Sequence, residues 1–372
     1  MSTHVAQAVP ITLDARVCGA IMGAFVGDAL GLGPHWYYDL DALRRDYGPW
    51  ISDYTEPRPD RYHAGLRAGQ SSQAGWLLEL TLRSLAARGA YDEADFCRRI
   101  DEEFFPQIDG TPLSGPGGYT SQSMREAWRA RVVQGRPWGE SGGYADNTEA
   151  AERVLAIAVR DALQPGQLAR DVCANTALTQ IDPTVMAMTV AYASVLGLLV
   201  QGHALDEAIS GKLMALVREG QLPFHTVTTA SESAVTRDSE KPRRELGQFA
   251  SPDALLMPSN IARAARDPDL RFEPAWKVSL LYGLPCAVYH QFPAAYYLAA
   301  RFGSDVETAV LTAINGGGQN QARAMLTGAL CGAIGGLQAI PQRWIDGLER
   351  SAERLQLARE IARDMQSTSH AG

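Results

Sequence analysis

The stretch LTAINGGGQNQARAMLTGALCGAIGG, residues 311–336, places a glycine turn directly before a helix. Three consecutive glycines, 316–318, end one helical pattern, and the next begins with three amides, Gln319, Asn320 and Gln321. Glycine permits positive φ angles and lets bare backbone approach a neighbour closely. A helix N-terminus presents unpaired N–H groups and a partial positive charge. The turn is therefore a candidate binding site for a polar or anionic ligand.

Small residues recur at every fourth position in this stretch and again near the N-terminus. The two sets are Ala324, Gly328, Gly332 and Gly336, and Gly19, Gly23, Gly27 and Gly31. Each glycine costs about 1 kcal/mol of helix propensity relative to alanine, so a close contact between helices must offset the loss. We expect both helices to lie at the centre of the fold and to touch each other or a common neighbour. Asp28, near the end of the first helix, could face the 316–321 turn.

Five segments of the chain resemble the ADP-ribosylglycohydrolase family. GAFVGDALG (23–31) is similar to the opening signature of the family, and NGGGQNQARAMLTGALCGAIGG (315–336) with AIPQRWIDGLE (339–349) is similar to its closing signature. PHWYYDLDAL (34–43) and ADNTEAAER (145–153) look more like the branch that contains the J-type lens crystallins. The resemblance spans residues 15–350 and implies an all-α fold, a compact orthogonal multi-helix bundle.

Composition and local patterns agree with one helical domain. The chain has 372 residues and is 46% hydrophobic, which is ample for a sizeable core. Because no linker interrupts the helical pattern, we predict a flexible tail over 1–14 and a single domain over 15–366. Apolar periodicity predicts continuous helices over 148–163 and 277–301, and the polar stretch 223–250 is interpreted as part helix and part exposed loop.

Charge, cysteine usage and hydropathy exclude several classes of protein. The net charge of −8 argues against a nucleic-acid or anionic-membrane surface. The N-terminus lacks the charged start and apolar core of a secretory signal. The apolar run Val185–Val200 is shorter than the roughly 20 residues of a membrane span, so we expect a buried core helix. Five cysteines without paired spacing indicate reduced thiols and a cytoplasmic protein.

The segment GQSSQAGWLLEL (69–80) stands where the family carries a Ser/Thr-Asp-Asp-Thr run, which there supplies ligands to a pair of magnesium ions. Ser72 keeps the hydroxyl, but Gln73, Ala74, Gln319 and Gln321 replace carboxylates at the matching positions. Mg²⁺ prefers carboxylate oxygens, so we expect the metal pair to be lost and no cofactor to be bound. Amides that donate and accept hydrogen bonds suit a neutral ligand's hydroxyls or a base edge. Alternatively, they bond one another across the helix ends.

Three carboxylates are candidate catalytic residues: Asp28, Asp146 and Glu149. If Asp146 and Glu149 turn into an apolar, glycine-walled cavity, burial raises the pKa of one carboxyl and creates an acid/base pair. Helix capping alone would also explain the run around them, although the resemblance places this region near the ribose site of the hydrolases. The candidate ligand-binding residues are His35, Trp36, Gln70, Ser72, Gln73, Asn147, Gly317, Gly318, Gln319, Asn320 and Gln321.

Three hypotheses of function follow from these patterns. The first is a metal-independent hydrolase, or a binder, of a ribosyl or other glycosidic small molecule. The second is a catalytically silent structural or ligand-binding member like the J-type crystallins, and the third is a magnesium-dependent ADP-ribosyl hydrolase. The expected partner is a small molecule with ribose or sugar hydroxyls, with no nucleic acid and no membrane, and a homo-oligomer stays open.

Overall fold

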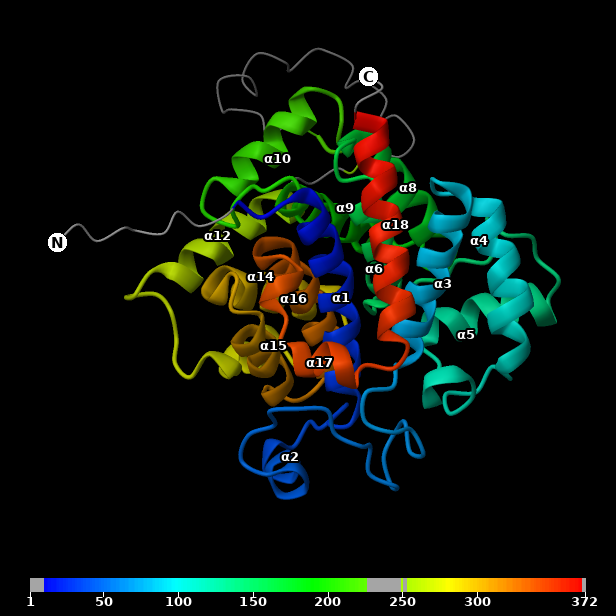
Figure 1. The fold of residues 1–372 in the computed structure, drawn as a ribbon. Coiled ribbons are helices and arrows are strands. Elements are labelled where there is room, and N and C mark those ends of the chain that lie inside the picture. The colour runs from blue at the N-terminus through cyan, green and yellow to red at the C-terminus, as the bar shows by residue number, and fades with distance from the viewer. Residues whose placement is uncertain (1–9, 226–248, 250–252, 370–372) are drawn as a thin grey trace, which may run out of the picture.

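The computed structural model describes residues 10–225, 249 and 253–369, and its described part consists of helices and loops without a strand. This confirms the predicted all-α fold (Figure 1). The α-helices are α1 (Leu13–Leu32), α2 (Leu40–Tyr47), α3 (Gln73–Arg88), α4 (Glu93–Arg99), α5 (Gln122–Trp128), α6 (Glu149–Arg153), α7 (Leu155–Arg160), α8 (Pro165–Ala177), α9 (Pro183–Val200), α10 (Ile209–Arg218), α12 (Asp253–Arg266), α13 (Val278–Tyr282), α14 (Val288–Phe302), α15 (Val306–Asn315), α16 (Asn320–Gly335), α17 (Gln342–Gly347) and α18 (Ser351–Ser369).

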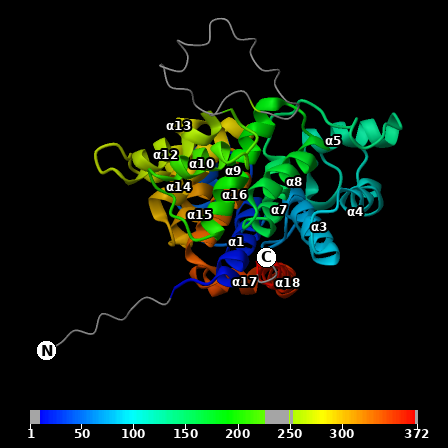
Figure 2. The ribbon, with the colours of Figure 1, turned by 90° about the horizontal axis from the view of Figure 1, so that it is seen from above.

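Helices α1 and α16 lie side by side in the middle of the bundle, as both ribbon views show (Figures 1 and 2). Their glycine stripes face each other. A Cβ added to Gly23 would lie 2.2 Å from the carbonyl oxygen of Gly328, and one added to Gly332 would lie 2.0 Å from that of Gly19. The two backbones are therefore in direct contact, which confirms that the glycine helices are central and touch.

Other helices cover the central pair on its remaining sides. Helices α14 and α15 pack against α16, and α18 packs against α1 (Figure 1). Among the helices of the described residues, two, α1 and α9, are long and apolar enough to cross a membrane, but 89% and 78% of their most apolar windows are buried inside the protein. The predicted core helix over Val185–Val200 is thus part of the buried α9.

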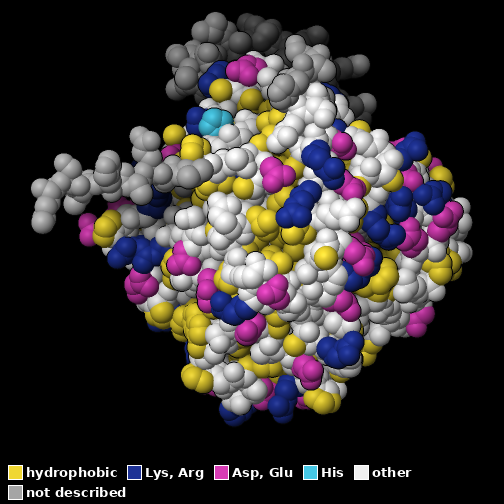
Figure 3. Space-filling view, in the orientation of Figure 1, with side chains coloured by type: hydrophobic (Ala, Val, Ile, Leu, Met, Phe, Trp, Pro, Cys, Tyr) yellow, Lys and Arg dark blue, Asp and Glu magenta, His cyan; other side chains and the backbone are white. Residues whose placement is uncertain are grey.

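On the face shown in Figure 3, basic and acidic side chains are interspersed.

Two predicted helices are broken in the structure. The segment 148–163 divides into α6 and α7, which meet at Val154. The segment 277–301 divides into α13 and α14, because Gly283 has a positive φ and Pro285 cannot donate a backbone hydrogen bond. This second break places Leu284 beside α16, where its carbonyl accepts a 2.8 Å hydrogen bond from the backbone N–H of Gln319.

Two predicted segments fall partly outside the described residues. The tail predicted over 1–14 lies outside them up to residue 9, and α1 already begins within it, at Leu13. Most of the ambiguous stretch 223–250 also lies outside the described residues.

The contact between α1 and α16 predicts a difference between two glycine-to-alanine variants. Gly23→Ala should destabilise the fold by about 1–3 kcal/mol, because its methyl group would meet the backbone of Gly328. Gly211→Ala, on α10, meets nothing within 4 Å and should be neutral or stabilising. Urea unfolding of both variants measures the difference. Equal stabilities would show that the glycine contact does not hold the bundle together.

Candidate functional site

A small pocket, with a cavity volume of about 50 Å³, lies where the first residues of four helices meet. Ser72, Ser121, Thr148 and Gln319, which immediately precede α3, α5, α6 and α16, all line it. The full lining consists of His35, Trp36, His63, Ser72, Gln73, Ala74, Tyr119, Ser121, Asn147, Thr148, Glu149, Glu152, Cys286, Gln319 and Gln321. Helix N-termini carry partial positive charge, so this arrangement favours carboxylates and hydrogen-bond acceptors at the pocket wall.

The structure brings together most of the residues that the sequence analysis selected. Those that line the pocket are His35, Trp36, Ser72, Gln73, Asn147, Glu149, Gln319 and Gln321. The others, which are not part of the lining, are Asp28, Gln70, Asp146, Gly317, Gly318 and Asn320.

Asp28 lies behind the pocket wall rather than on it. Its carboxylate is fully buried and accepts hydrogen bonds from the backbone N–H of Ser72 at 3.1 Å, from the Ser72 hydroxyl, and from Nε2 of Gln321 at 2.8 Å. Burial raises the pKa of Asp28, and the Ser72 hydrogen bonds act against it. Asp28 therefore positions two lining residues and does not itself contact the pocket.

Asp146 does not turn into the cavity, contrary to the prediction. Its side chain is exposed and accepts a 2.8 Å hydrogen bond from the hydroxyl of Tyr289 on α14. The cause is local: the backbone carbonyl of Asp146 accepts from the N–H of Val288, which fixes this segment against the start of α14. Gln70 also points elsewhere, since its amide donates to Glu349.

The glycine turn and Asn320 serve the backbone rather than the pocket. Gly317 and Gly318 have φ angles of +66° and +61°, and the N–H of Gly318 donates to the carbonyl of Tyr37 at 2.8 Å. The amide of Asn320 donates to the carbonyls of Pro34 and Ile314. These contacts hold the loop after α1 against the start of α16.

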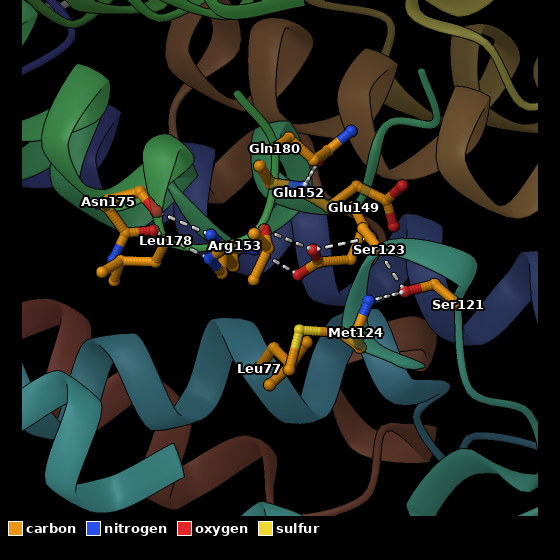
Figure 4. Close-up of polar contacts among 12 residues, drawn as sticks. Leu77, Ser121, Ser123, Met124, Glu149, Glu152, Arg153, Asn175, Leu178 and Gln180 are labelled. Carbon is orange, nitrogen blue, oxygen red and sulfur yellow. Dashed lines mark hydrogen bonds and ion pairs between the residues drawn. The ribbon is translucent and has the colours of Figure 1, made fainter. Parts of the chain in front are cut away.

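Glu149 is part of a buried ion pair at the pocket wall (Figure 4). Its Oε1 lies 2.5 Å from Nη1 of Arg153, and its Oε2 accepts from the hydroxyls of Ser123 at 3.0 Å and Thr179 at 3.2 Å. Arg153 is itself held by Asn175, whose side-chain oxygen and backbone carbonyl accept at 2.8 and 2.7 Å. Glu149 is thus a fixed carboxylate with a preset orientation.

Glu152, one helical turn further along α6, was not selected from the sequence. It is buried in the pocket wall, accepts a hydrogen bond from the hydroxyl of Thr148, and lies 3.4 Å from Nε2 of Gln321. Burial raises the pKa of Glu152 to about 7, and the nearby carboxyls of Asp28 and Glu149 act in the same direction. Near neutral pH, Glu152 can therefore either give or take a proton.

Two histidines form a chain of contacts that ends at the pocket. Nδ1 of His63 contacts the carbonyl of Gly117, Nε2 of His63 lies 2.5 Å from Nδ1 of His35, and Nε2 of His35 lies 2.8 Å from the side-chain amide of Gln319. Burial lowers the pKa of His35 well below its usual value and that of His63 to about 4. Both imidazoles are therefore neutral at physiological pH.

An aromatic wall separates this pocket from a wider hollow outside it. Trp36, His63, Tyr119 and Cys286 line both spaces. The ring of Trp36 stacks on His35 with centroids 4.0 Å apart and meets Tyr119 edge-on at 4.3 Å. Trp36 and His63 have φ angles of +60° and +68°, which are strained for residues other than glycine. Such strain persists where surrounding contacts hold it and often marks functional sites.

Gln73, Gln319 and Gln321 stand at positions that the resemblance matches to metal ligands, and their side chains are amides. The Gln73 oxygen accepts from the backbone N–H of Ser121 at 2.8 Å, and its NH₂ group donates to the Ser121 hydroxyl. A Cβ at position 75 would lie 2.2 Å from Oδ2 of Asp28, so no larger side chain fits there. Across the described residues, no three His, Cys, Asp or Glu side chains are grouped to hold a metal ion. This donor set differs from the carboxylate-rich sets that Mg²⁺ prefers.

Several lining residues come from segments that carried little signal in the sequence. His63 and Tyr119 lie in long loops, and Cys286 lies in the unexpected break between α13 and α14. Glu152 could have been found, because residues three apart on a helix share a face and Glu149 had already been selected.

Comparisons with known proteins agree with this fold. A solved structure described as an "ADP-ribosylglycohydrolase-related protein complex" superposes with a TM-score of 0.60 at 19% identity, covering 95% of this chain and 99% of that one. A protein of Archaeoglobus fulgidus, described only as uncharacterized, is 23% identical over 337 residues, which are 91% of this chain and 92% of that protein. The structural similarity defines the class of fold.

The model of the ADP-ribosylglycohydrolase family matches residues 10–371, and the chain belongs to that family. The narrower resemblance to the J-type crystallin branch stays a prediction.

The burial of Glu152 predicts a specific dependence of stability on pH. An acid with a higher pKa in the folded than in the unfolded state favours folding at low pH, and this advantage is lost as pH rises from about 4.5 to about 7. Glu152→Gln should therefore unfold with a flatter pH dependence between pH 5 and 8, and the difference should approach about 3 kcal/mol. Thermal unfolding across this range tests it. Parallel curves for the two proteins would contradict the raised pKa.

Proposed function

We propose that the protein hydrolyses an N- or O-glycosidic bond of a ribosyl-containing small molecule without a metal ion. The observation that carries the proposal is the placement of Glu152, a buried carboxyl in the pocket wall beside a second acid, Glu149, where burial raises the pKa of Glu152 to about 7. Two carboxyls in unlike environments are the usual means of supplying an acid and a base from the same residue type.

Glu152 suits the role of general acid. A carboxyl that is half protonated near pH 7 can donate its proton to the oxygen or nitrogen of a leaving group as the glycosidic bond breaks. Its Oε1 is held by Thr148, and the longer contact to Gln321 leaves Oε2 less tightly held. After the bond breaks, the resulting carboxylate can accept a proton from the attacking water.

Glu149 suits the role of a fixed negative charge. Glycosidic bond cleavage passes through an oxocarbenium-like state that carries positive charge on the sugar. A carboxylate held by Arg153, Ser123 and Thr179 needs no reorganisation to stabilise that charge. Gln73, Gln319 and Gln321 then offer amide groups for the sugar hydroxyls.

The silent-binder hypothesis is favoured by a different observation. Both oxygens of Glu149 already have protein partners, and Asp28 is fully enclosed by Ser72 and Gln321. A site in which these two acids are committed to internal contacts could hold a ligand without reacting with it. The distinction is decided by turnover.

Turnover in the presence of EDTA tests the proposed hydrolase. A panel of N-ribosides, O-ribosides and ADP-ribosylated amides should contain a substrate whose hydrolysis survives the chelator. Glu152→Gln and Glu149→Gln should each lower kcat by about a hundredfold or more, which is the usual size of acid–base and electrostatic contributions. Asp146→Asn, an exposed carboxylate outside the pocket, is the matched control and should leave kcat unchanged. Ligand binding without turnover would support the silent binder.

Titration with Mn²⁺ tests the absence of the metal pair. Because the amides at positions 73, 319 and 321 replace carboxylates, electron paramagnetic resonance should detect no saturable Mn²⁺ site up to millimolar concentrations. The triple variant with aspartate at these three positions is the comparison that offers the ion carboxylates. A stoichiometric site in the wild type that disappears in Glu152→Gln would contradict the proposal and favour the metal-dependent hydrolase.

A further inference from the structure

Three contacts link Gly117, His63, His35 and Gln319 in a chain. With the Gln319 oxygen facing His35, these contacts need more hydrogens than two neutral imidazoles supply. Three contacts must each contain one hydrogen, and two neutral imidazoles supply one hydrogen each. At one end, the carbonyl of Gly117 can only accept. The third hydrogen must therefore come from the other end, from the NH₂ group of Gln319.

The Gly117 carbonyl, which can only accept, sets the direction of every hydrogen bond along the chain. Nδ1–H of His63 donates to Gly117, so Nε2 of His63 is an acceptor for Nδ1–H of His35. Nε2 of His35 is then also an acceptor, and the amide of Gln319 must turn its NH₂ group toward it. The orientation of an amide group is assigned from its hydrogen bonds, because its oxygen and nitrogen are nearly indistinguishable in shape.

The alternative that keeps the Gln319 oxygen facing His35 requires a positively charged imidazole. Both rings are buried, with 4% of His35 and 2% of His63 exposed, and their hydrogen-bond partners are each other, Gly117 and Gln319. None of these partners is a carboxylate that would stabilise the charge. Burial therefore favours the neutral pair.

We propose that His63 and His35 are positioning residues that orient the Gln319 amide so that its oxygen faces the pocket as a hydrogen-bond acceptor. This inference rests on the proposed function only for the identity of the ligand, and it narrows the ligand's chemistry. The ligand group opposite Gln319 must be a donor, such as a sugar hydroxyl. An ionised phosphate or carboxylate, which has acceptors only, does not match this position.

Gln321 adds a second acceptor to the pocket wall. Its Nε2 donates to Asp28 and Glu152, which directs its Oε1 away from both carboxyls, and within the described part of the chain that oxygen accepts no hydrogen bond. Gln319 and Gln321 both line the pocket. Two amide oxygens in one pocket suit a ligand with more than one hydroxyl group.

The imidazole tautomers can be read directly by long-range ¹H–¹⁵N correlation on protein labelled with ¹⁵N-histidine. At pH 7.5, His35 and His63 should both carry their proton on Nδ1 and have an unprotonated Nε2. The signals can be assigned by their loss in His35→Gln and His63→Gln. A proton on Nε2 of His35, or an imidazolium pattern for either ring, would overturn the proposal.

A variant that replaces the Gln319 amide with a carboxyl group tests the same hydrogen-bond chain in a second way. In Gln319→Glu, an ionised carboxylate can only accept, so His35 should become doubly protonated and show the imidazolium ¹⁵N shifts. A protonated carboxyl would instead donate to Nε2 of His35 and leave the ring neutral with its proton on Nδ1. Gln73→Glu is the matched control, because its side chain contacts Ser121 and neither imidazole. A neutral His35 that carries its proton on Nε2 in Gln319→Glu would contradict the hydrogen-bond chain.

Binding measurements then test the ligand. A riboside that binds should lose at least tenfold in affinity when one ring hydroxyl is replaced by fluorine, which cannot donate, and this loss should shrink in Gln319→Leu. Equal affinities for all the fluorinated analogues would refute the assigned donor. If no riboside binds, the proposed function fails, while the tautomers still decide the orientation of Gln319.

Discussion

The backbone contact between α1 and α16 is the constraint on which the site depends. Because four glycines on α1 present no side chain of their own to α16, the two helices touch along their length and their ends are placed in fixed register. The last of these glycines, Gly31, packs directly against Gln321. A Cβ added to Gly31 would lie 2.4 Å from the Cα of Gln321. The same contact therefore brings Gln321 within 2.8 Å of Asp28.

From that point, the arrangement of the pocket follows through hydrogen bonds. Gln321 stands between two acids, and its NH₂ group donates to Asp28 on one side and to Glu152 on the other. Asp28 in turn holds Ser72 at the start of α3. One amide thus links α1, α3, α6 and α16, and holds a buried acid at the pocket wall.

The central helices and much of the pocket were predictable because their signals are local. Glycines at fixed spacing and amides at a helix start can be recognised without knowledge of the fold. Glu149 was predicted for the same reason, and Glu152 was overlooked although it shares that helix face. Asp146 was misplaced, because its orientation depends on Tyr289, more than a hundred residues away in the sequence. The roles of His63 and Cys286 depend likewise on long loops and on the break before α14, whose paths are decided by tertiary contacts.

The central claim is that Glu152 is a pocket acid poised near neutral pH, and its pKa can be measured directly. A pH titration of the side-chain carboxyl carbon in protein labelled with ¹³C-glutamate, assigned by the loss of one signal in Glu152→Gln, follows its ionisation in the folded state. The account predicts a midpoint at about 7. A midpoint near 4.5, the ordinary value for glutamate, would show that the pocket does not hold Glu152 in the state required for an acid catalyst.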